Sequence, residues 1–380
     1  MSGLLPNVDP DGLLEYSVVF TDRSLNHMSQ QFQQVMRDIS STLKSVYRAH
    51  SVVVVPGGGT YAMEAVARQL AQDQHCLVLR NGWFSYRWSQ IFDVGRIPRS
   101  CTVLKARPVA AGAWAPFTPA PLTEVVETIR RERPGLVFAP HVETASGILL
   151  PEDYLRAVGT ATHEVGGLFV LDCVASGALW VDMDTSAVDI LISAPQKGWS
   201  ASPCSGLVML SPAARERIAD TQSSSFACDL KKWLEIMAAY EQGGHAYHAT
   251  MPTDSLQRFR DTMLETLELG LDDLRQQQRE LGHRVRELFA RHGFQSVAAP
   301  EFAAPGVAVF YTDDESMQSG RPFLEQGLQV AAGVPLMCDE RPDYKSFRIG
   351  LFGLDKLTSI DRTVANLEQA LADLPPKLDR

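Results

Sequence analysis

Short runs of four or five apolar residues recur along the chain, and each ends at a proline or a polar residue. Such runs are typical of strands that are buried on both faces of a parallel sheet. The runs are Val52–Val55, Cys76–Leu79, Leu136–Ala139, Leu168–Leu171, Val188–Ile192, which Asp189 interrupts, and Gly206–Leu210. We expect the last of them to be an antiparallel or edge strand.

Between these runs, apolar residues recur at intervals of three and four, as on one face of a helix. The segments with this spacing are Gln30–Tyr47, Ala62–Leu70, Leu122–Arg133, Asp153–Thr162 and Asp229–Glu241. From Asp254 to His292 the same spacing is interrupted at Gly270, which predicts a linker helix that leads into a C-terminal domain. The alternation of strands and helices predicts an α/β fold.

The C-terminal third contains two more predicted strands, Val307–Tyr311 and Phe347–Leu351, and a closing helix, Ser359–Leu374. We therefore divide the chain into three parts. These are an N-terminal segment over residues 1–29, a large domain over residues 30–255 and a smaller domain over residues 256–380.

The composition is that of an ordinary globular protein, with 45% hydrophobic and 21% charged residues in a chain of 380. A net charge of −10 disfavours binding to nucleic acid or to an anionic membrane surface. No apolar run approaches the ~20 residues of a membrane span, and the first ten residues lack the basic region of a signal peptide. Six cysteines without a CxxC pair indicate reduced thiols in a cytoplasm, and no metal site.

The strand Val52–Val55 leads into Gly57-Gly58-Gly59-Thr60, and a predicted helix follows. A strand, a glycine turn and a helix N-terminus in this order can bind phosphate, because free backbone N–H groups and the helix dipole face the anion. The stretch has neither the GxGxxG of a dinucleotide-binding fold nor the lysine of a P-loop. The alternative is an ordinary strand-to-helix turn.

Two charged residues follow predicted strands that we expect to be neighbours. Asp172 ends the run Leu168–Leu171, and Lys197 lies in the turn after Val188–Ile192. Open α/β sheets bind ligands at the carboxyl ends of their strands. There a partly neutral lysine can form a Schiff base with a carbonyl group, and a buried aspartate can pair with a protonated pyridine nitrogen. The alternatives are a solvated loop lysine and an aspartate that caps a helix or anchors a loop.

Two other stretches also follow strand ends. Asn81–Tyr86 carries three aromatic residues that could cover the face of a planar ring, although packing in the core is the simpler explanation. His141–Gly147 gathers polar side chains, which is typical of a loop that faces a ligand.

With these motifs in register, the chain is similar to the class V aminotransferases of fold type I, and within them it most resembles the alanine–glyoxylate and serine–glyoxylate aminotransferase branch. The stretches that carry the resemblance are Gly57–Ala65, Asn81–Phe84, His141–Gly147, Leu171–Ser176, Ser193–Lys197, Tyr247–Pro252 and Phe347–Gly350. The resemblance implies an α/β fold whose large domain has a mostly parallel seven-stranded sheet, with a smaller α+β C-terminal domain. It also implies pyridoxal 5′-phosphate as the cofactor.

The resemblance assigns a role to each matching residue. Lys197 would hold the cofactor as a Schiff base and later shuttle a proton, and Asp172 would keep the pyridine nitrogen protonated. Arg348 would bind the substrate carboxylate as a bidentate pair. Around the cofactor would lie Val174 and Phe84 on the ring faces, Thr144 near the phenolic oxygen, Gly58, Gly59, Thr60 and Gln196 at the phosphate, and Tyr247 and Thr250 at the phosphate of the partner subunit.

Two of these residues also have simpler interpretations, and the chain departs from the family pattern in one place. Tyr247 could be an ordinary interface residue, and Arg348 a charge on a sheet surface. The resemblance implies that the N-terminal segment, residues 1–29, lines the active site. Relatives usually carry a Pro-Gly-Pro-like stretch there, which this chain lacks. Arg23 lies in that region and could select a longer, acidic donor, or it could form a surface or intrachain ion pair.

We expect a homodimeric transaminase that moves the amino group of a small amino acid to a 2-oxo acid, with glyoxylate or pyruvate as the acceptor. The alternatives are a lyase or desulfurase on the same fold, a catalytically silent cofactor-binding regulatory protein, and a nucleotide-dependent α/β enzyme. A desulfurase needs a nucleophilic cysteine, and Cys338 lies ten residues before Arg348. Its apolar neighbours Val334–Met337 favour an inert thiol.

Overall fold

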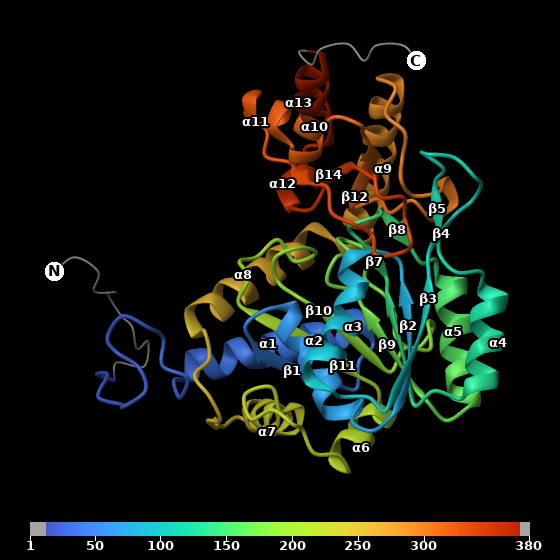
Figure 1. Cartoon of the computed structure of the whole chain (residues 1–380). Coiled ribbons are helices and arrows are strands. Elements are labelled where there is room, and N and C mark those ends of the chain that lie inside the picture. The colour runs from blue at the N-terminus through green and yellow to red at the C-terminus, as the bar shows by residue number, and fades with distance from the viewer. Residues whose placement is uncertain (1–12, 373–380) are drawn as a thin grey trace.

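The computed structural model describes residues 13–372, and a seven-stranded sheet forms the centre of the larger part (Figure 1). The strand order is β1 (Ser51–Pro56), β11 (Ser205–Leu210), β10 (Ile190–Ser193), β9 (Leu168–Asp172), β6 (Leu136–Pro140), β2 (His75–Arg80) and β3 (Ser100–Lys105). β11 runs antiparallel to both of its neighbours, and every other pair is parallel. The predicted mostly parallel sheet is confirmed.

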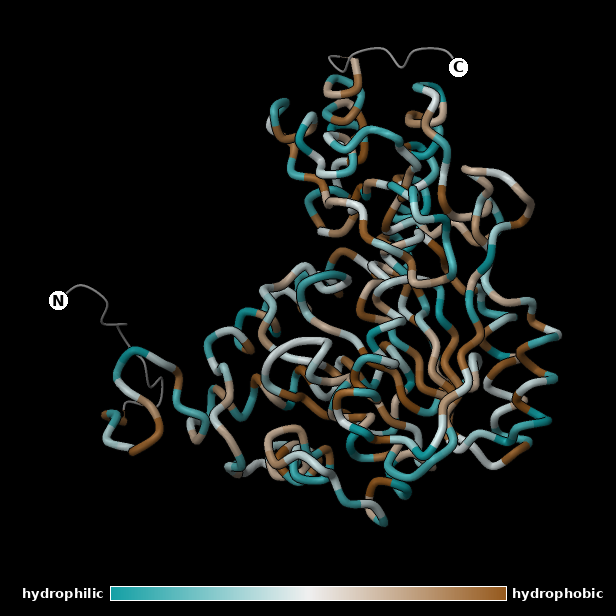
Figure 2. The backbone as a smooth tube through the Cα atoms, in the orientation of Figure 1, coloured by the Kyte–Doolittle hydropathy of each residue, from teal (hydrophilic) through white to brown (hydrophobic). Residues whose placement is uncertain are grey.

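Helices pack around this sheet because their apolar faces need cover. At the right of Figure 1, α4 (Leu122–Glu132) packs against α5 (Glu152–Glu164). At the left, α1 (Gln30–Tyr47) contacts α7 (Leu230–Glu241) and α8 (Thr253–Leu269). The sheet also contacts α2 (Gly59–Leu70) and α3 (Trp83–Gly95), and α6 (Pro212–Ala219) lies beside β11. Figure 2 shows the most hydrophobic stretches of the chain converging in the strands.

A smaller part lies above the sheet in Figure 1 and is built on the antiparallel strands β12 (Val307–Tyr311), β14 (Ser346–Gly350) and β13 (Ala331–Ala332). Its long helix α9 (Leu271–Arg291) packs on α13 (Ile360–Ala372) and on β12, and α12 (Leu354–Leu357) lies between the helices. Two short helices, α10 (Glu315–Ser319) and α11 (Arg321–Glu325), complete it. We call the two parts the large and the small domain.

The break at Gly270 between α8 and α9 is confirmed, and its positive φ of 86° is a conformation that favours glycine. The domain boundary at residue 255 stays a prediction, since it falls inside α8, which packs on the large domain. The predicted closing helix corresponds to α13, and the end of that prediction, at Leu374, lies outside the described residues. Within residues 13–372, none of the helices combines the length and apolarity that crossing a bilayer requires.

The helix α3 and the strand β3 are among the elements that were not predicted. The first turn of α3 contains the aromatic stretch that we interpreted as a ring-covering loop or as core. Trp83, Phe84 and Tyr86 lie half-buried along this helix. Trp83 and Phe84 pack against buried apolar residues, in line with the core interpretation, and the ring-covering role stays a prediction. β3 is an edge strand whose residues are partly exposed, so it lacks the continuous apolar run that marked the other strands.

Candidate active site

Parallel pairing brings the carboxyl ends of the central strands to one edge of the sheet, which faces the small domain. Asp172 is the last residue of β9 and pairs with Ile192 of β10, so the turn that holds Lys197 begins beside it. A close backbone approach fixes that turn. A Cβ atom on Gly198 would lie 2.5 Å from the carbonyl oxygen of Gly177, so only glycine fits after the lysine.

Asp172 is buried, and desolvation raises the pKa of its carboxyl to about 6. The backbone N–H of Val174 donates to Oδ1 at 2.9 Å and lowers the pKa, as do Arg87 and Lys197, whereas the nearby Glu143 raises it. Within the described residues, the other carboxyl oxygen has no hydrogen-bond partner. A protonated ring nitrogen is the kind of cation that would stabilise this carboxylate.

The Lys197 amine is half-buried, and its Nζ lies 4.9 Å from the centroid of the Phe352 ring. Burial and then the positive charge of Arg348 lower the pKa of the amine, while Asp172 and Glu143 oppose that shift. A lowered pKa increases the neutral, nucleophilic fraction that attacks a carbonyl group. The predicted pair Lys197 and Asp172 therefore shares one electrostatic environment.

The glycine turn begins α2 directly beside Val174. A Cβ atom on Gly59 would lie 2.7 Å from Cγ2 of Val174, so the turn approaches this residue, two positions after Asp172, as closely as glycine allows. The first N–H groups of a helix have no acceptor within the helix. Gln196, in the turn just before Lys197, is half-buried, and its side-chain amide N–H groups are hydrogen-bond donors. The free N–H groups at the start of α2 and the Gln196 amide group fit a phosphate, and the Asp172 carboxylate fits a pyridinium nitrogen.

Two arginines flank the ring of Phe84, which stands in the first turn of α3. The guanidinium carbon of Arg348 lies 5.5 Å from the ring centroid and that of Arg87 lies 5.3 Å from it. Arg87 also donates from Nη1 to Oγ1 of Thr60 at 3.0 Å. Arg348 donates from Nε to the carbonyl oxygen of Ala332 at 2.8 Å, and its terminal nitrogens have no acceptor in the described part of the chain. They are the two donors that a bidentate carboxylate uses.

Glu143 belongs to the polar stretch His141–Gly147 and was not predicted to have a role, but in the structure it anchors this region. Its side chain is fully buried and accepts from the backbone N–H groups of Phe84, Ser85 and Ala145 and from the Ser85 hydroxyl. The carboxylate thus caps α3 and holds the backbone on both sides of the predicted ring-binding loop. The neighbouring Thr144 is buried. The only sign of this role in the sequence was an acidic residue within a stretch that was predicted to face a ligand.

We expect Glu143→Gln to lower the free energy of unfolding by about 1–3 kcal/mol, because the amide leaves some of the four buried donors unsatisfied. Chemical denaturation of the purified variant measures this. Glu164→Gln is the control, since Glu164 forms an exposed ion pair with Arg130 and should change stability little. Equal stability of the two variants would contradict the anchoring role.

Tyr247 and Thr250 do not join the cluster around Lys197 in the described chain. Their hydroxyl groups lie 3.1 Å apart on an exposed loop after α7, and the Tyr247 ring lies 5.6 Å from the His27 ring in the N-terminal segment. Their predicted role at a partner's phosphate stays a prediction.

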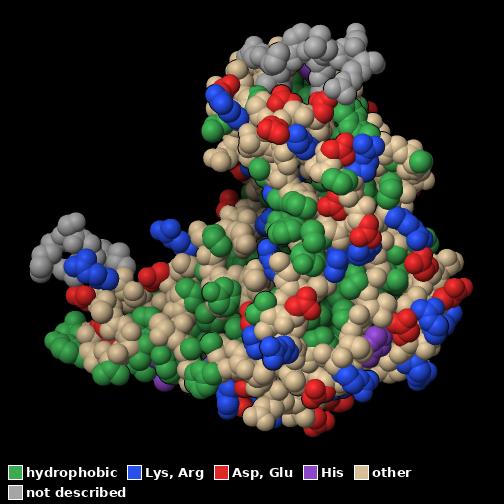
Figure 3. Space-filling model, in the orientation of Figure 1, with side chains coloured by type: hydrophobic (Ala, Val, Ile, Leu, Met, Phe, Trp, Pro, Cys, Tyr) green, Lys and Arg blue, Asp and Glu red, His purple; other side chains and the backbone are tan. Residues whose placement is uncertain are grey.

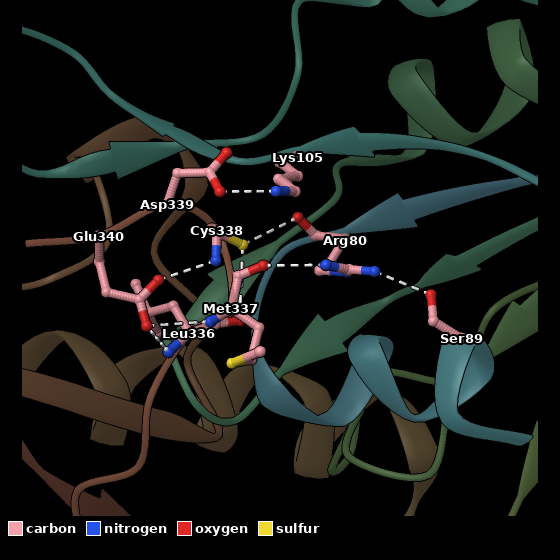
Figure 4. A network of polar contacts seen from close by, with 8 residues as sticks. All are labelled: Arg80, Ser89, Lys105, Leu336, Met337, Cys338, Asp339 and Glu340. Carbon is pink, nitrogen blue, oxygen red and sulfur yellow. Dashed lines mark hydrogen bonds and ion pairs between the residues drawn. The ribbon is translucent and has the colours of Figure 1, made fainter. Parts of the chain in front are cut away.

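Cys338 lies in a loop of the small domain that is held against the large domain (Figure 4). Its thiol is buried and donates to the carbonyl oxygen of Arg80, and burial raises the thiol pKa. The Glu340 carboxylate accepts from three successive backbone N–H groups, including that of Cys338. A rigid, buried and protonated thiol supports the inert interpretation over that of a desulfurase nucleophile.

Comparison with known proteins agrees with this geometry. The profile of the family described as aminotransferase class-V matches residues 13–338. The alanine–glyoxylate aminotransferase of Callithrix jacchus is 30% identical over 337 residues, which cover 87% of this chain and 73% of the relative. A 2-aminoethylphosphonate–pyruvate transaminase of Vibrio vulnificus is 26% identical over 347 residues, with 89% and 88% covered.

Solved structures show the same fold. The crystal structure of an alanine–glyoxylate aminotransferase from Nostoc sp. matches with a TM-score of 0.76 at 24% identity, covering 91% of this chain and 88% of that one. A ureidoglycine–glyoxylate aminotransferase from Bacillus subtilis matches equally well, at 20% identity, with 94% and 88% covered. The chain belongs to the class V aminotransferase family and is a pyridoxal phosphate-dependent aminotransferase of fold type I.

Proposed function

We propose that this aminotransferase transfers the amino group of a small amino acid to glyoxylate or pyruvate, and that Lys197 holds the cofactor. The observation that carries the proposal is the placement of a lysine with a lowered pKa beside a buried aspartate, at the carboxyl ends of adjacent strands. Glyoxylate and pyruvate appear in the names of the relatives from Callithrix jacchus and Vibrio vulnificus.

Bound pyridoxal phosphate supplies an electron sink for the bond that breaks at the substrate Cα. The chain's own residues position that chemistry. Asp172 would keep the ring nitrogen protonated, the Lys197 amine would move the proton at the substrate Cα, and Arg348 would orient the substrate through its carboxylate. The residues proposed around the cofactor are Phe84 and Val174 at the ring faces, Thr144 at the phenolic oxygen, and Gly58, Gly59, Thr60 and Gln196 at the phosphate.

The proposal is tested with a panel of amino donors against glyoxylate, pyruvate and 2-oxoglutarate. The purified protein should show a yellow absorbance band that borohydride abolishes, and its highest kcat/KM should fall on a small donor with glyoxylate or pyruvate. A preference for 2-oxoglutarate would overturn the acceptor assignment. A protein that stays colourless after incubation with pyridoxal phosphate would overturn the assignment of Lys197.

We also propose that the active species is a cytoplasmic homodimer with shared sites. The N-terminal segment extends away from the body of the chain in Figure 1, and hydrophobic side chains gather along it in Figure 3. Several large apolar side chains on this segment, in α2 and near the Tyr247 loop are more than half exposed. They are Leu13, Leu14, Tyr16, Val18, Tyr61, Phe226 and Tyr247. Exposed apolar surface of this extent is typical of an interface. All six cysteines are free, which supports a reducing compartment.

In a shared site, Tyr247→Phe should weaken cofactor retention without unfolding the chain, because one hydrogen bond to the partner's phosphate is lost. Gel filtration followed by the visible spectrum measures retention, and Tyr154→Phe, which removes a buried hydroxyl in α5, is the control. Mixing the Tyr247→Phe and Lys197→Ala chains should restore activity, because the heterodimer has one intact site. Full activity of a monomer would contradict the arrangement.

The role of Arg23 as a selector of acidic donors rests on its position in the N-terminal segment, where its side chain is exposed. If the Arg23 side chain contacts the second acidic group of a donor that is bound in the partner's site, Arg23→Ala should lower kcat/KM for acidic donors alone. The donor panel run on Arg23→Ala beside the unaltered protein measures this. A uniform loss, or none, would leave a small neutral amino acid as the donor.

A further inference from the structure

Two adjacent cavities lie on the side of α9 that faces the large domain. Their volumes are about 340 and 480 Å³, and Leu149, Leu179 and Arg279 line both. Leu149 belongs to the short strand β8 (Ile148–Leu149), and Leu179 follows the turn after β9, so the walls come from both domains. The catalytic pair Lys197 and Asp172 lines neither cavity.

The helix contributes a row of basic side chains to these cavities. Arg275, Arg279, His283 and Arg286 are spaced by three or four residues, which places them along one face of α9. The lining of the larger cavity contains no aspartate or glutamate, whereas Glu152 and Asp182 line the smaller one. The larger cavity therefore combines positive charge with mainly apolar walls.

The positive charges of Arg279 and Arg286 lack carboxylate partners. Arg286 donates from Nη2 to the carbonyl oxygen of Val307 at 2.9 Å, but its Nε is buried without an acceptor among residues 13–372. Arg279 has no hydrogen bond or ion pair in the same part of the chain. Burial without a counterion lowers the pKa of Arg286 to about 10. A desolvated cation of this kind is stabilised when an anion binds beside it.

We propose that the larger cavity is a binding site for a small organic anion. A carboxylate or phosphate group would pair with Arg279 and Arg286, because guanidinium groups match the geometry of both. The apolar body of the ligand would pack on the aliphatic side chains of the cavity. These are Leu149, Leu179, Ala298, Pro300 and Pro305.

Two connections lead from this cavity to the catalytic residues. Arg286 bonds to the first residue of β12, which pairs with the strand that carries Arg348, at Val309. On another face of α9, Gln278 donates to the carbonyl oxygen of Leu351, next to the Phe352 ring against which Lys197 lies. An anion bound in this cavity would contact residues of both domains.

Calorimetric titration of the holoenzyme with benzoate and with phenyl phosphate tests the site, and neutral benzamide is the matched ligand control. The two anions distinguish a carboxylate from a phosphate ligand. Because an anion can also bind at Arg348, the titration is repeated on Arg348→Gln, which keeps only the α9 site. In that background, Arg279→Gln and Arg286→Gln should each weaken binding about tenfold or more, the loss expected for a charged hydrogen bond.

Arg284→Gln is the control variant, because Arg284 lies on the same helix but pairs with Asp361 and lines neither cavity. It should bind like its Arg348→Gln parent. Arg279 is exposed, so its replacement keeps the test valid even if the Arg286 variant fails to fold. Binding that disappears entirely in Arg348→Gln, or that is equal in the Arg279 and Arg284 variants, would overturn the proposal. Either result leaves the proposed transamination unaffected, because the titration reads binding and not turnover.

Discussion

Replacing Lys197 with alanine is expected to lower kcat by several orders of magnitude. The side chain serves twice, since its amine would hold the cofactor and then move the proton at the substrate Cα, and general acid–base catalysis alone contributes about 10²–10⁴-fold. The surroundings of the Lys197 amine favour both functions. Burial and Arg348 lower the pKa of the amine, and Asp172 lies at the end of the adjacent strand.

Steady-state turnover and the visible spectrum of the Lys197→Ala variant measure the effect. Borohydride should no longer attach the cofactor covalently to the chain, and an added primary amine should restore part of the rate by replacing the missing base. Lys232→Ala is the control, because Lys232 is an exposed residue of α7 that pairs with Glu235. A Lys197→Ala variant that keeps more than about a tenth of the turnover would contradict the assignment, given the expected loss.

Removing the Arg348 guanidinium should reduce kcat/KM for donor and acceptor alike. Leaving a carboxylate unpaired in a partly desolvated pocket costs about 2–5 kcal/mol, which corresponds to roughly 30- to 5,000-fold in kcat/KM. The two terminal nitrogens of Arg348 have no acceptor in the described chain, while Nε is held by Ala332, so the group is oriented for a bidentate partner. Arg348→Gln preserves the size of the site better than alanine.

Kinetics of both half-reactions with the Arg348→Gln variant provide the measurement. Arg341→Gln is the control, because Arg341 forms an exposed pair with Asp343 and should leave both rates unchanged. A loss confined to one half-reaction would show that Arg348 does not bind the carboxylate common to the two substrates. Cofactor retention should stay normal, which separates this variant from Lys197→Ala.

Much of the fold was predictable because its signals are local. Each buried strand of the central sheet is a run of apolar residues, and the long helices α1, α8 and α9 show regular apolar spacing. The edge strand β3 and the aromatic helix α3 were missed for the same reason. The residues of β3 are partly exposed, so they do not form a continuous apolar run. The N-terminus of α3 is capped by the Glu143 carboxylate, which lies 58 or 59 residues away in sequence.

By itself, the sequence determined the residue types and their order: a glycine turn after one strand, an aspartate at the end of another, and a lysine after a third. Parallel pairing then brings these positions to one edge, because strands that run the same way end on the same side. Only the tertiary structure decided that Glu143 anchors the first turn of α3 around Phe84, that Arg87 reaches Thr60, and that two arginines without carboxylate partners line a cavity between the domains. Those contacts join residues far apart in the chain, and they depend on burial and distance, which no local pattern encodes.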